Sequence, residues 1–319
     1  MSAVTLRPVT LRLGSRRSPM AVAQSRQVAG MITERTGRPV EIVGVTTLGD
    51  VSRAQLTQIG GTGVFVSALR EALLGGEVDL AVHSLKDLPT GHAAGVALAA
   101  VPPRDDPRDA LVARDGAKLA DLPPGARIGT GSPRRAAQLR LMRPDVRPVP
   151  VRGNAGTRLA KVTSGELDAV VLARAGLDRI GQLDVITEVF EPDEMIPAAG
   201  QGALAVECRD TDQELAGLLA CVDDQDTHAA ATAERAVLAG LRAGCHAPVG
   251  AYAIATDMLR LRAVVIGDDG SPPLAASAAA PAGEAEALGL QVARELLDSG
   301  AGRYLTAAAA HTSNGDDAQ

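Results

Sequence analysis

The sequence predicts an α/β protein made of two similar α/β units and a smaller α+β domain at the C-terminus. From residue 11 to about residue 172, short apolar runs alternate with amphipathic ones, which is typical of a parallel sheet whose strands are connected by helices. After residue 218, alanine-rich helical and alternating strand patterns follow one another. A chain of 319 residues is also long enough for two or three domains, each with its own core.

The first unit begins with a predicted strand over residues 11–14. Ser18 and Pro19 then open a helix, because a serine cap followed by proline is a common helix start, and Gly37 ends it. The pattern continues with strands over residues 40–46 and 79–84 and a helix over residues 63–74.

A proline-rich link over residues 101–107 leads into the second unit. Ser132 and Pro133 open a helix that runs to about residue 142, and a further helix covers residues 157–164. Strands are predicted over residues 109–114, 127–129, 146–151 and 168–172.

The two units share two local patterns. A strand, a glycine and then Ser-Pro at a helix start occur at residues 14–19 and again at residues 129–133. Gly-Glu-x-Asp leads into a buried strand at residues 76–79 and at residues 165–168. The spacing between these patterns differs, so the repeat is not strict, and chance resemblance is the alternative. The shared patterns predict two domains of one topology that face a common cleft, as in periplasmic binding proteins.

The C-terminal region is predicted to contain a helix over residues 227–241, strands over 249–255 and 259–266, and a helix over 284–297. We expect the tail after Leu305 to be disordered. No apolar run approaches the roughly 20 residues that span a bilayer, and the N-terminus lacks a continuous apolar segment typical of signal peptides. These observations predict a cytoplasmic protein.

The cysteines and histidines give no metal or disulfide pattern. Three cysteines without a CxxC pair argue against a disulfide framework and a structural zinc site, and the five histidines lack metal-ligand spacing. Cys208 in a predicted strand and Cys221 at a helix end are expected to be inert. Cys245 lies in a turn-rich loop, residues 243–250. From the residues alone, an inert thiol and a reactive thiol are equally compatible with this position.

The basic residues are nearly all arginine, since only three of 32 are lysine. Genome composition could produce this bias, but arginine also binds carboxylates in a two-pronged geometry that lysine cannot supply. The net charge of −6 means that any polyanion site must be a local concentration of arginine. Only four aromatic residues are present, which disfavours single-stranded nucleic-acid binding.

Arginines gather in three loops at predicted helix starts, where free backbone N–H groups and the helix dipole favour anions. Taken alone, each of these arginines is more typical of a solvent-exposed surface side chain than of a binding residue. Three such loops in one chain predict a polyanion-binding cleft. The loops cover residues 14–19, 129–135 and 152–158.

Lys86 and Asp87 follow directly after a buried strand, in the segment His83-Ser84-Leu85-Lys86-Asp87. A surface turn is the plain alternative. Nearby positive charge would keep such a carboxylate ionised, so that it could stabilise a cationic intermediate in an arginine-lined cleft.

In order and over nearly the full length, these segments resemble the porphobilinogen deaminase family. The most specific are HSxKDxP at residues 83–89, RGNxGTRL at 152–159 and GCxxPxG at 244–250. Further matches are residues 15–21, 104–110, 129–135 and 197–203.

The resemblance implies a transferase of tetrapyrrole biosynthesis that condenses four porphobilinogen molecules, with loss of ammonia, into hydroxymethylbilane. The chain would grow on a dipyrromethane cofactor attached through a thioether to Cys245, and Asp87 would be the catalytic carboxylate. By position, the residues that hold the cofactor are Lys86, Ser132, Arg134, Arg135 and Asp50. Those that bind the incoming substrate or the growing chain are Arg16, Ser18, Arg152, Arg158 and Arg179.

The resemblance also implies three domains: residues 1–102 with 200–222, residues 103–199, and residues 223–319. The residue patterns above predict no metal and no nucleic-acid or membrane partner, and a monomer is the default. Leu48 and Thr62 depart from the family, which often has arginine and lysine at these positions. It is therefore in doubt that the loop over the cleft contributes basic side chains to ligand binding. The alternative is a non-catalytic anion-binding protein or sensor on the same scaffold, which would need neither a cofactor nor Cys245.

Overall fold

The computed structural model describes residues 10–45, 63–244, 247–267 and 271–305. Its contacts divide the chain into unit 1, residues 1–104 with 203–228, and unit 2, residues 105–202 with 229–319. Each unit is described by itself. The division into three domains stays a prediction.

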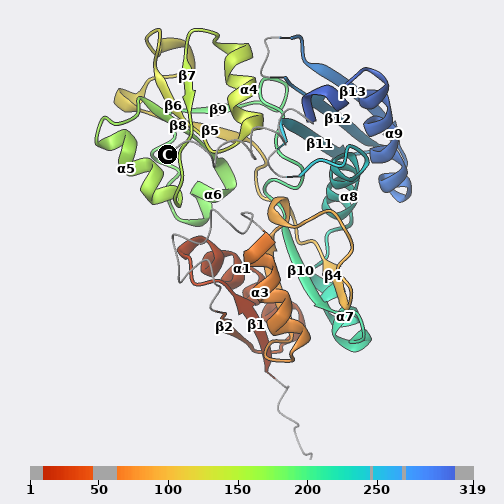
Figure 1. The fold of residues 1–319 in the computed structure, drawn as a ribbon. Coiled ribbons are helices and arrows are strands. Elements are labelled where there is room, and N and C mark those ends of the chain that lie inside the picture. The colour runs from red at the N-terminus through yellow and green to blue at the C-terminus, as the bar shows by residue number, and fades with distance from the viewer. Residues whose placement is uncertain (1–9, 46–62, 245–246, 268–270, 306–319) are drawn as a thin grey trace, which may run out of the picture. The chain divides into compact units, whose positions relative to one another are not determined.

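Unit 1 contains a five-stranded mixed sheet in the order β2-β1-β3-β10-β4 (Figure 1). β1 pairs in parallel with β2 and β3, and β10 pairs antiparallel with β3 and β4. The strands are β1 (Leu11–Ser15), β2 (Val40–Gly44), β3 (Leu80–Ser84), β4 (Val96–Ala100) and β10 (Leu204–Arg209). The helices are α1 (Pro19–Thr36), α3 (Gly63–Leu74) and α7 (Gln213–Leu219).

Alternation along β1 lets two helices pack on the sheet. Leu13 shares a core cluster with Val28 and Ile32 of α1. The next residue, Gly14, points the other way: a Cβ there would lie 3.3 Å from the side chain of Leu69 on α3. The period of two in the strand therefore places α1 and α3 against opposite faces.

Unit 2 contains a second five-stranded sheet in the order β7-β6-β8-β5-β9. β6 pairs in parallel with β7 and β8, and β5 pairs antiparallel with β8 and β9. The strands are β5 (Asp109–Ala113), β6 (Arg127–Gly129), β7 (Arg147–Val149), β8 (Ala169–Ala173) and β9 (Glu188–Phe190). The helices of this part are α4 (Pro133–Met142), α5 (Ala155–Thr163) and α6 (Arg174–Arg179).

The two sheets have one topology, as the shared sequence patterns predict. In each, the second strand in the order has two parallel neighbours, the fourth strand runs antiparallel to the third, and the fifth, at the edge, pairs antiparallel with the fourth. The antiparallel strands β5 and β10 differ from the all-parallel sheet that the alternating pattern indicates. In unit 1 the antiparallel strand comes from residues 204–209, far along the chain.

The rest of unit 2 is an α+β arrangement, as predicted. An antiparallel sheet of β11 (Val249–Ala255), β12 (Leu259–Val265) and β13 (Leu274–Ala280) packs against α9 (Ala285–Asp298). α8 (Gln225–Gly240) contributes to the same core. A Cβ at Gly289 would lie 2.3 Å from the carbonyl oxygen of Ala233, so only glycine allows α9 to approach α8 this closely.

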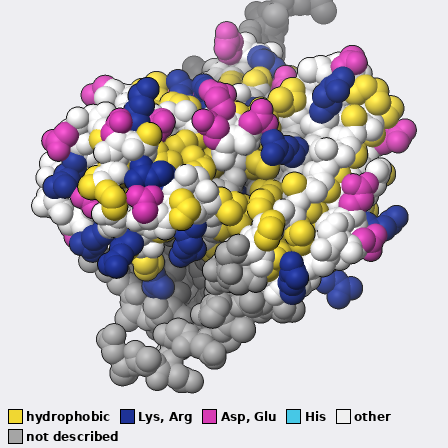
Figure 2. Space-filling view, turned by 90° about the horizontal axis from the view of Figure 1, so that it is seen from above, with side chains coloured by type: hydrophobic (Ala, Val, Ile, Leu, Met, Phe, Trp, Pro, Cys, Tyr) yellow, Lys and Arg dark blue, Asp and Glu magenta, His cyan; other side chains and the backbone are white. Residues whose placement is uncertain are grey.

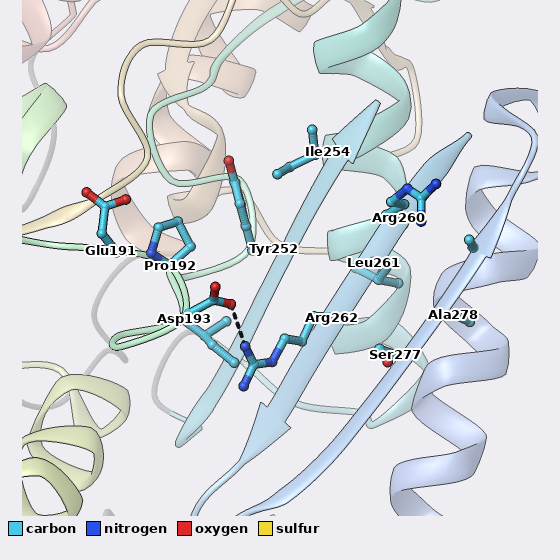
Figure 3. Close-up of a pocket in the computed structure, with 12 residues that line it drawn as sticks. Glu191, Pro192, Asp193, Tyr252, Ile254, Arg260, Leu261, Arg262, Ser277 and Ala278 are labelled. Carbon is cyan, nitrogen blue, oxygen red and sulfur yellow. Dashed lines mark hydrogen bonds and ion pairs between the residues drawn. The ribbon is translucent and has the colours of Figure 1, made fainter. Parts of the chain in front are cut away.

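The outer face of this small sheet carries a pocket of about 730 Å³ (Figure 3). Tyr252 pairs across the strands with Arg262, whose Nη1 lies 2.7 Å from Asp193. The lining includes two arginines, Arg260 and Arg262, and two acidic residues, Glu191 and Asp193, so it has no excess of positive charge. None of the predicted site residues that the structure describes lines this pocket.

The charged side chains are interspersed on the face that Figure 2 shows, with Lys and Arg beside Asp and Glu. Within the described ranges, no helix is long and apolar enough to cross a membrane. Among those same residues, no cluster of His, Cys, Asp and Glu could hold a metal ion.

Candidate anion-binding site

Arg16 and Ser18 lie at the carboxyl end of β1, where α1 begins. Ser18 caps this helix, because its side-chain oxygen accepts a hydrogen bond from the backbone N–H of Ala21 at 3.2 Å. Both residues are partly buried. Pro19 has no N–H and Ala21 is bound to Ser18, so the backbone N–H of Met20 and the helix dipole are what make this strand end suitable for an anion.

Lys86 and Asp87 lie on a single 3₁₀ turn, η1 (Leu85–Asp87), directly after β3. Leu85 is fully buried and anchors the turn, so that Asp87 is exposed while Lys86 is partly buried. Because β1 and β3 are parallel neighbours, this turn lies at the same edge of the sheet as Arg16 and Ser18. Gln24 of α1 donates to Ser84 Oγ at 2.6 Å and links the two loops.

Unit 2 places Ser132 in the corresponding position, between β6 and α4. Its side chain accepts a hydrogen bond from the backbone N–H of Arg135 at 3.4 Å and caps the helix. The preceding residue, Gly131, is needed here, because a Cβ would lie 2.9 Å from the carbonyl oxygen of Val151. The loop after β6 therefore packs closely against the loop after β7.

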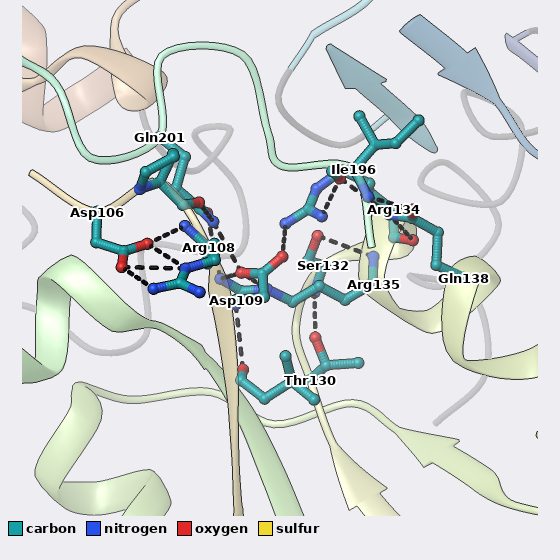
Figure 4. A network of polar contacts seen from close by, with 12 residues as sticks. Asp106, Arg108, Asp109, Thr130, Ser132, Arg134, Arg135, Gln138, Ile196 and Gln201 are labelled. Carbon is teal, nitrogen blue, oxygen red and sulfur yellow. Dashed lines mark hydrogen bonds and ion pairs between the residues drawn. The ribbon is translucent and has the colours of Figure 1, made fainter. Parts of the chain in front are cut away.

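Arg134 and Arg135 are buried in the first turn of α4, where they share the carboxylate of Asp109 (Figure 4). Arg134 Nη2 lies 2.7 Å from Asp109 Oδ2, and Arg135 donates from Nε and Nη2 to Oδ1 at 2.9 and 2.7 Å. Burial alone would raise the pKa of Asp109, but the two guanidinium charges hold it well below its ordinary value.

Arg158 lies on α5, partly buried, and approaches the same loop. Its Nη2 would be 3.9 Å from a Cβ at Gly131, and its Nε donates to the carbonyl oxygen of Gly153 at 3.0 Å. Burial lowers the pKa of Arg158, and the positive charge of Arg135 lowers it further. No ion pair to Arg158 occurs in the described part of the chain. Arg152, at the end of the preceding loop, is exposed.

These observations fit an acidic ligand at the β6–α4 and β7–α5 loops. The guanidinium groups of Arg135 and Arg158 repel each other there, and of these two only that of Arg135 is paired with Asp109. A ligand carboxylate beside Arg158 and the N-terminus of α4 would remove this repulsion. The side chains present are thus of the kind that a cofactor or substrate with several carboxylates needs.

Arg179 is held differently from the other predicted residues. Its Nε donates to Asp105 Oδ2 at 2.8 Å, and its Nη2 donates to the carbonyl oxygen of Gly202 at 2.7 Å. Burial lowers the pKa of Arg179, an effect that Asp105 opposes. These contacts join the two points at which the chain enters and leaves the first part of unit 2.

The structure adds residues that the sequence analysis did not single out. Asp105 and Asp109 bind predicted arginines, and Gln201 donates to Asp109 at 2.9 Å. All three fall within segments that match the family, residues 104–110 and 197–203. For Asp109, the sequence did offer one signal: an aspartate at the start of a predicted buried strand.

Two predicted site residues, Cys245 and Asp50, lie outside the described residues, as do Leu48, Thr62 and the tail after Leu305. The other two cysteines are free, Cys208 buried and Cys221 partly buried. Burial raises the pKa of both thiols, which agrees with the expectation that they are inert.

Two family models match the chain. "Porphobilinogen deaminase, dipyromethane cofactor binding domain" covers residues 11–217, and "Porphobilinogen deaminase, C-terminal domain" covers residues 228–298. A porphobilinogen deaminase from Thermobifida fusca is 60% identical over 311 residues, which are 94% of this chain and 97% of that protein. Porphobilinogen deaminase 1 from Streptomyces coelicolor is 56% identical, over 91% of this chain and 96% of its own length.

Among solved structures, a periplasmic substrate-binding protein of an ABC transporter from Coxiella burnetii aligns with a TM-score of 0.42 and 15% identity. The alignment covers 66% of this chain and 91% of that one. At this level the likeness carries no weight, and the description of the fold depends on the topology of the two sheets.

Proposed function

Because the chain belongs to the porphobilinogen deaminase family, we propose that arginines at the strand ends of its two sheets hold the acidic pyrroles on which this enzyme works. The enzyme is a transferase of tetrapyrrole biosynthesis. It condenses four porphobilinogen molecules, with loss of ammonia, into hydroxymethylbilane on a covalently bound dipyrromethane cofactor.

The observation that supports the site most directly is the position of Arg158. Its partly buried guanidinium group is repelled by Arg135 and lies beside the N-terminus of α4. Each pyrrole ring brings an acetate and a propionate, so negative charge accumulates with every condensation. A site with positive charge left over can bind such a chain, because charge-assisted hydrogen bonds are stronger than neutral ones.

The residues proposed to hold the cofactor are Lys86, Ser132, Arg134, Arg135 and Asp50. When bound, the dipyrromethane supplies the free α-carbon at which the first substrate is joined. We assign its attachment to the thiol of Cys245. The residues proposed to bind incoming porphobilinogen or the growing chain are Arg16, Ser18, Arg152, Arg158 and Arg179.

Asp87 is the proposed catalytic carboxylate. It is exposed at the end of η1, on the sheet edge that also carries Arg16 and Ser18. Loss of ammonia leaves porphobilinogen as an electrophilic cation, which arginines cannot stabilise. A fixed carboxylate beside that cation and the pyrrole N–H lowers the barrier to its formation.

We further propose that the enzyme is a cytoplasmic monomer whose partners are porphobilinogen and the growing polypyrrole. The free thiols of Cys208 and Cys221 suit a reducing compartment. Size-exclusion chromatography with light scattering tests the monomer, and a dimer mass would contradict it.

The cofactor attachment is tested by the intact mass of the purified protein. We expect an adduct of the size of a dipyrromethane on the wild-type chain and no adduct on Cys245→Ser, with Cys221→Ser as the matched control that keeps it. An unmodified but active wild-type protein would overturn the assignment.

The role of Asp87 is tested by Asp87→Ala, with Asp184→Ala, an exposed aspartate remote in sequence, as control. The Asp87 variant should keep the circular dichroism spectrum and unfolding midpoint of the wild type and lose turnover by at least about 100-fold. Near-normal turnover would remove Asp87 from the mechanism.

A further inference from the structure

Asp109, the first residue of β5, is a fully buried carboxylate that neither the reaction nor the proposed site uses directly. It accepts hydrogen bonds from Arg135 and Gln201 on Oδ1, and Oδ2 lies 2.7 Å from Arg134 (Figure 4). A buried charge is costly unless it is paired and hydrogen-bonded. Oδ1 is hydrogen-bonded, and Oδ2 is paired by charge with Arg134 but accepts no hydrogen bond from the described residues. Both arginines belong to the proposed cofactor site.

The same contacts determine where the two guanidinium groups point. Besides Asp109, Arg135 donates to the carbonyl oxygen of Val171 at 3.2 Å and to Gln201 Oε1 at 3.3 Å. Arg134 donates from Nη1 to the carbonyl oxygen of Ile196 at 2.6 Å. Among the residues that the structure describes, Asp109 is the carboxylate that pairs with both arginines, and it lies between them.

Gln201 fixes the carboxylate from the other side. Its Nε2 donates both to Asp109 Oδ1 at 2.9 Å and to the carbonyl oxygen of Pro107 at 2.7 Å. Gln201 itself is fully buried. The carboxylate therefore has one orientation, which in turn gives each arginine one orientation.

We propose that Asp109 is a positioning residue for the cofactor: its carboxylate holds Arg134 and Arg135 in the one arrangement in which the β6–α4 loop accepts the cofactor's carboxylates. This inference rests on the proposed role of these two arginines.

A positioning role and a purely electrostatic role of Asp109 predict opposite changes in the binding of an acidic ligand when its charge is removed. Removing a negative charge beside an anion site should strengthen the binding of an acidic ligand if charge alone decides. If Asp109 acts by orienting the arginines, its removal weakens that binding although the site becomes more positive.

The experiment measures cofactor loading by intact mass on full-length protein, from matched preparations of wild type, Asp109→Asn and Asp79→Asn. Asp79 is the matched control, since it also pairs with two arginines, Arg12 at 2.7 Å and Arg209 at 3.7 Å, outside the proposed site. We expect the ratio of modified to unmodified chain to fall at least about tenfold in Asp109→Asn and to stay at the wild-type level in Asp79→Asn. Equal or higher loading of Asp109→Asn would overturn the proposal.

A second pair of variants covers the case in which Asp109→Asn does not fold. Arg134→Met/Asp109→Asn has the same cluster charge as the wild type, and it is compared with Arg134→Met alone. The proposal expects lower loading in the double variant, because Arg135 has lost its positioning partner. Equal or higher loading in the double variant contradicts it.

Failure of this inference is distinguishable from failure of the proposed function. A wild-type chain without an adduct, or an adduct that survives in Cys245→Ser, would overturn the proposed function. Loading that depends on Cys245 and is insensitive to Asp109 would overturn this inference alone.

Discussion

In unit 1 the two arginines of the first loop, Arg16 and Arg17, precede the serine that caps α1, whereas in unit 2 Arg134 and Arg135 follow the serine that caps α4. The two loops otherwise agree: each joins the second strand in the order of its sheet, β1 or β6, to a helix that starts with Ser-Pro. Arginines before the cap remain in the loop, with Arg16 partly buried and Arg17 exposed. Arginines after it lie in the first helical turn and are buried.

The difference explains why unit 2 needs an internal carboxylate. Two buried guanidinium groups in one helical turn repel each other and lose their hydration, and Asp109 offsets both costs. The loop arginines of unit 1 keep access to solvent. Moving a pair of arginines by a few residues across a helix cap thus changes them from surface groups into parts of the core.

The largest expected effect is on stability in unit 2. Arg135→Met should lower the free energy of unfolding by about 3–5 kcal/mol, because it removes a charge partner of buried Asp109 and the bonds to Val171 and Gln201. Arg17→Met should change it by less than about 0.5 kcal/mol, since Arg17 is exposed. Urea unfolding measures both, and similar losses in the two variants would break the comparison.

Unit 1 has its own buried carboxylate, Glu207 on β10, which gives a prediction about pH. Arg70 binds it at 2.5 Å and His83 Nε2 lies 3.2 Å away. Burial would raise the pKa of Glu207, but these partners lower it to about 2. The native state therefore binds fewer protons than the unfolded chain between the ordinary glutamate pKa and about 2, so this stability is present near neutral pH and is lost as the pH falls through that window.

The stability involved is on the order of 3 kcal/mol. Glu207→Gln should flatten the dependence of unfolding free energy on pH between about 4.5 and 2. Asp184→Asn, at an exposed aspartate, should leave that dependence unchanged. If the slope of unfolding free energy against pH is the same in Glu207→Gln as in the wild type, the contacts of Glu207 with Arg70 and His83 do not contribute to the acid dependence of stability.

The two serine caps should differ by a smaller amount. Ser18→Ala should cost about 1 kcal/mol of stability, a typical value for a helix cap. Ser132→Ala should cost less, about 0.5 kcal/mol, because its bond to the first turn is 3.4 Å long against 3.2 Å for Ser18. Thermal unfolding compares them, and a larger loss for Ser132→Ala would reverse the order.

The parts of the fold that local chemistry determines could be predicted from the sequence. Ser18-Pro19 and Ser132-Pro133 mark the starts of α1 and α4, and the alternation at residues 249–255 matches β11. β13 was missed because its sequence, LAASAAA, lacks the β-branched residues that favour strands. The short β4, β9, α6 and α7 were missed as well.

Contacts between distant segments were beyond such reasoning. The antiparallel direction of β5 and β10 depends on which strands they join, and no local pattern encodes this choice. For the same reason the partners of the predicted arginines were not foreseen: Asp109 meets Arg135 across 26 residues, and Asp105 meets Arg179 across 74. The arginine loops could be located from the sequence, but not which of their side chains are buried.

The most direct test of the central claim, that the strand-end arginines hold the growing acidic chain, is the intact-mass spectrum of the enzyme after a brief incubation with porphobilinogen. The account predicts that Arg158→Gln stalls, with the species carrying the most added rings reduced at least about tenfold, while Arg17→Gln shows the wild-type pattern. An unchanged pattern of added rings in Arg158→Gln would contradict it.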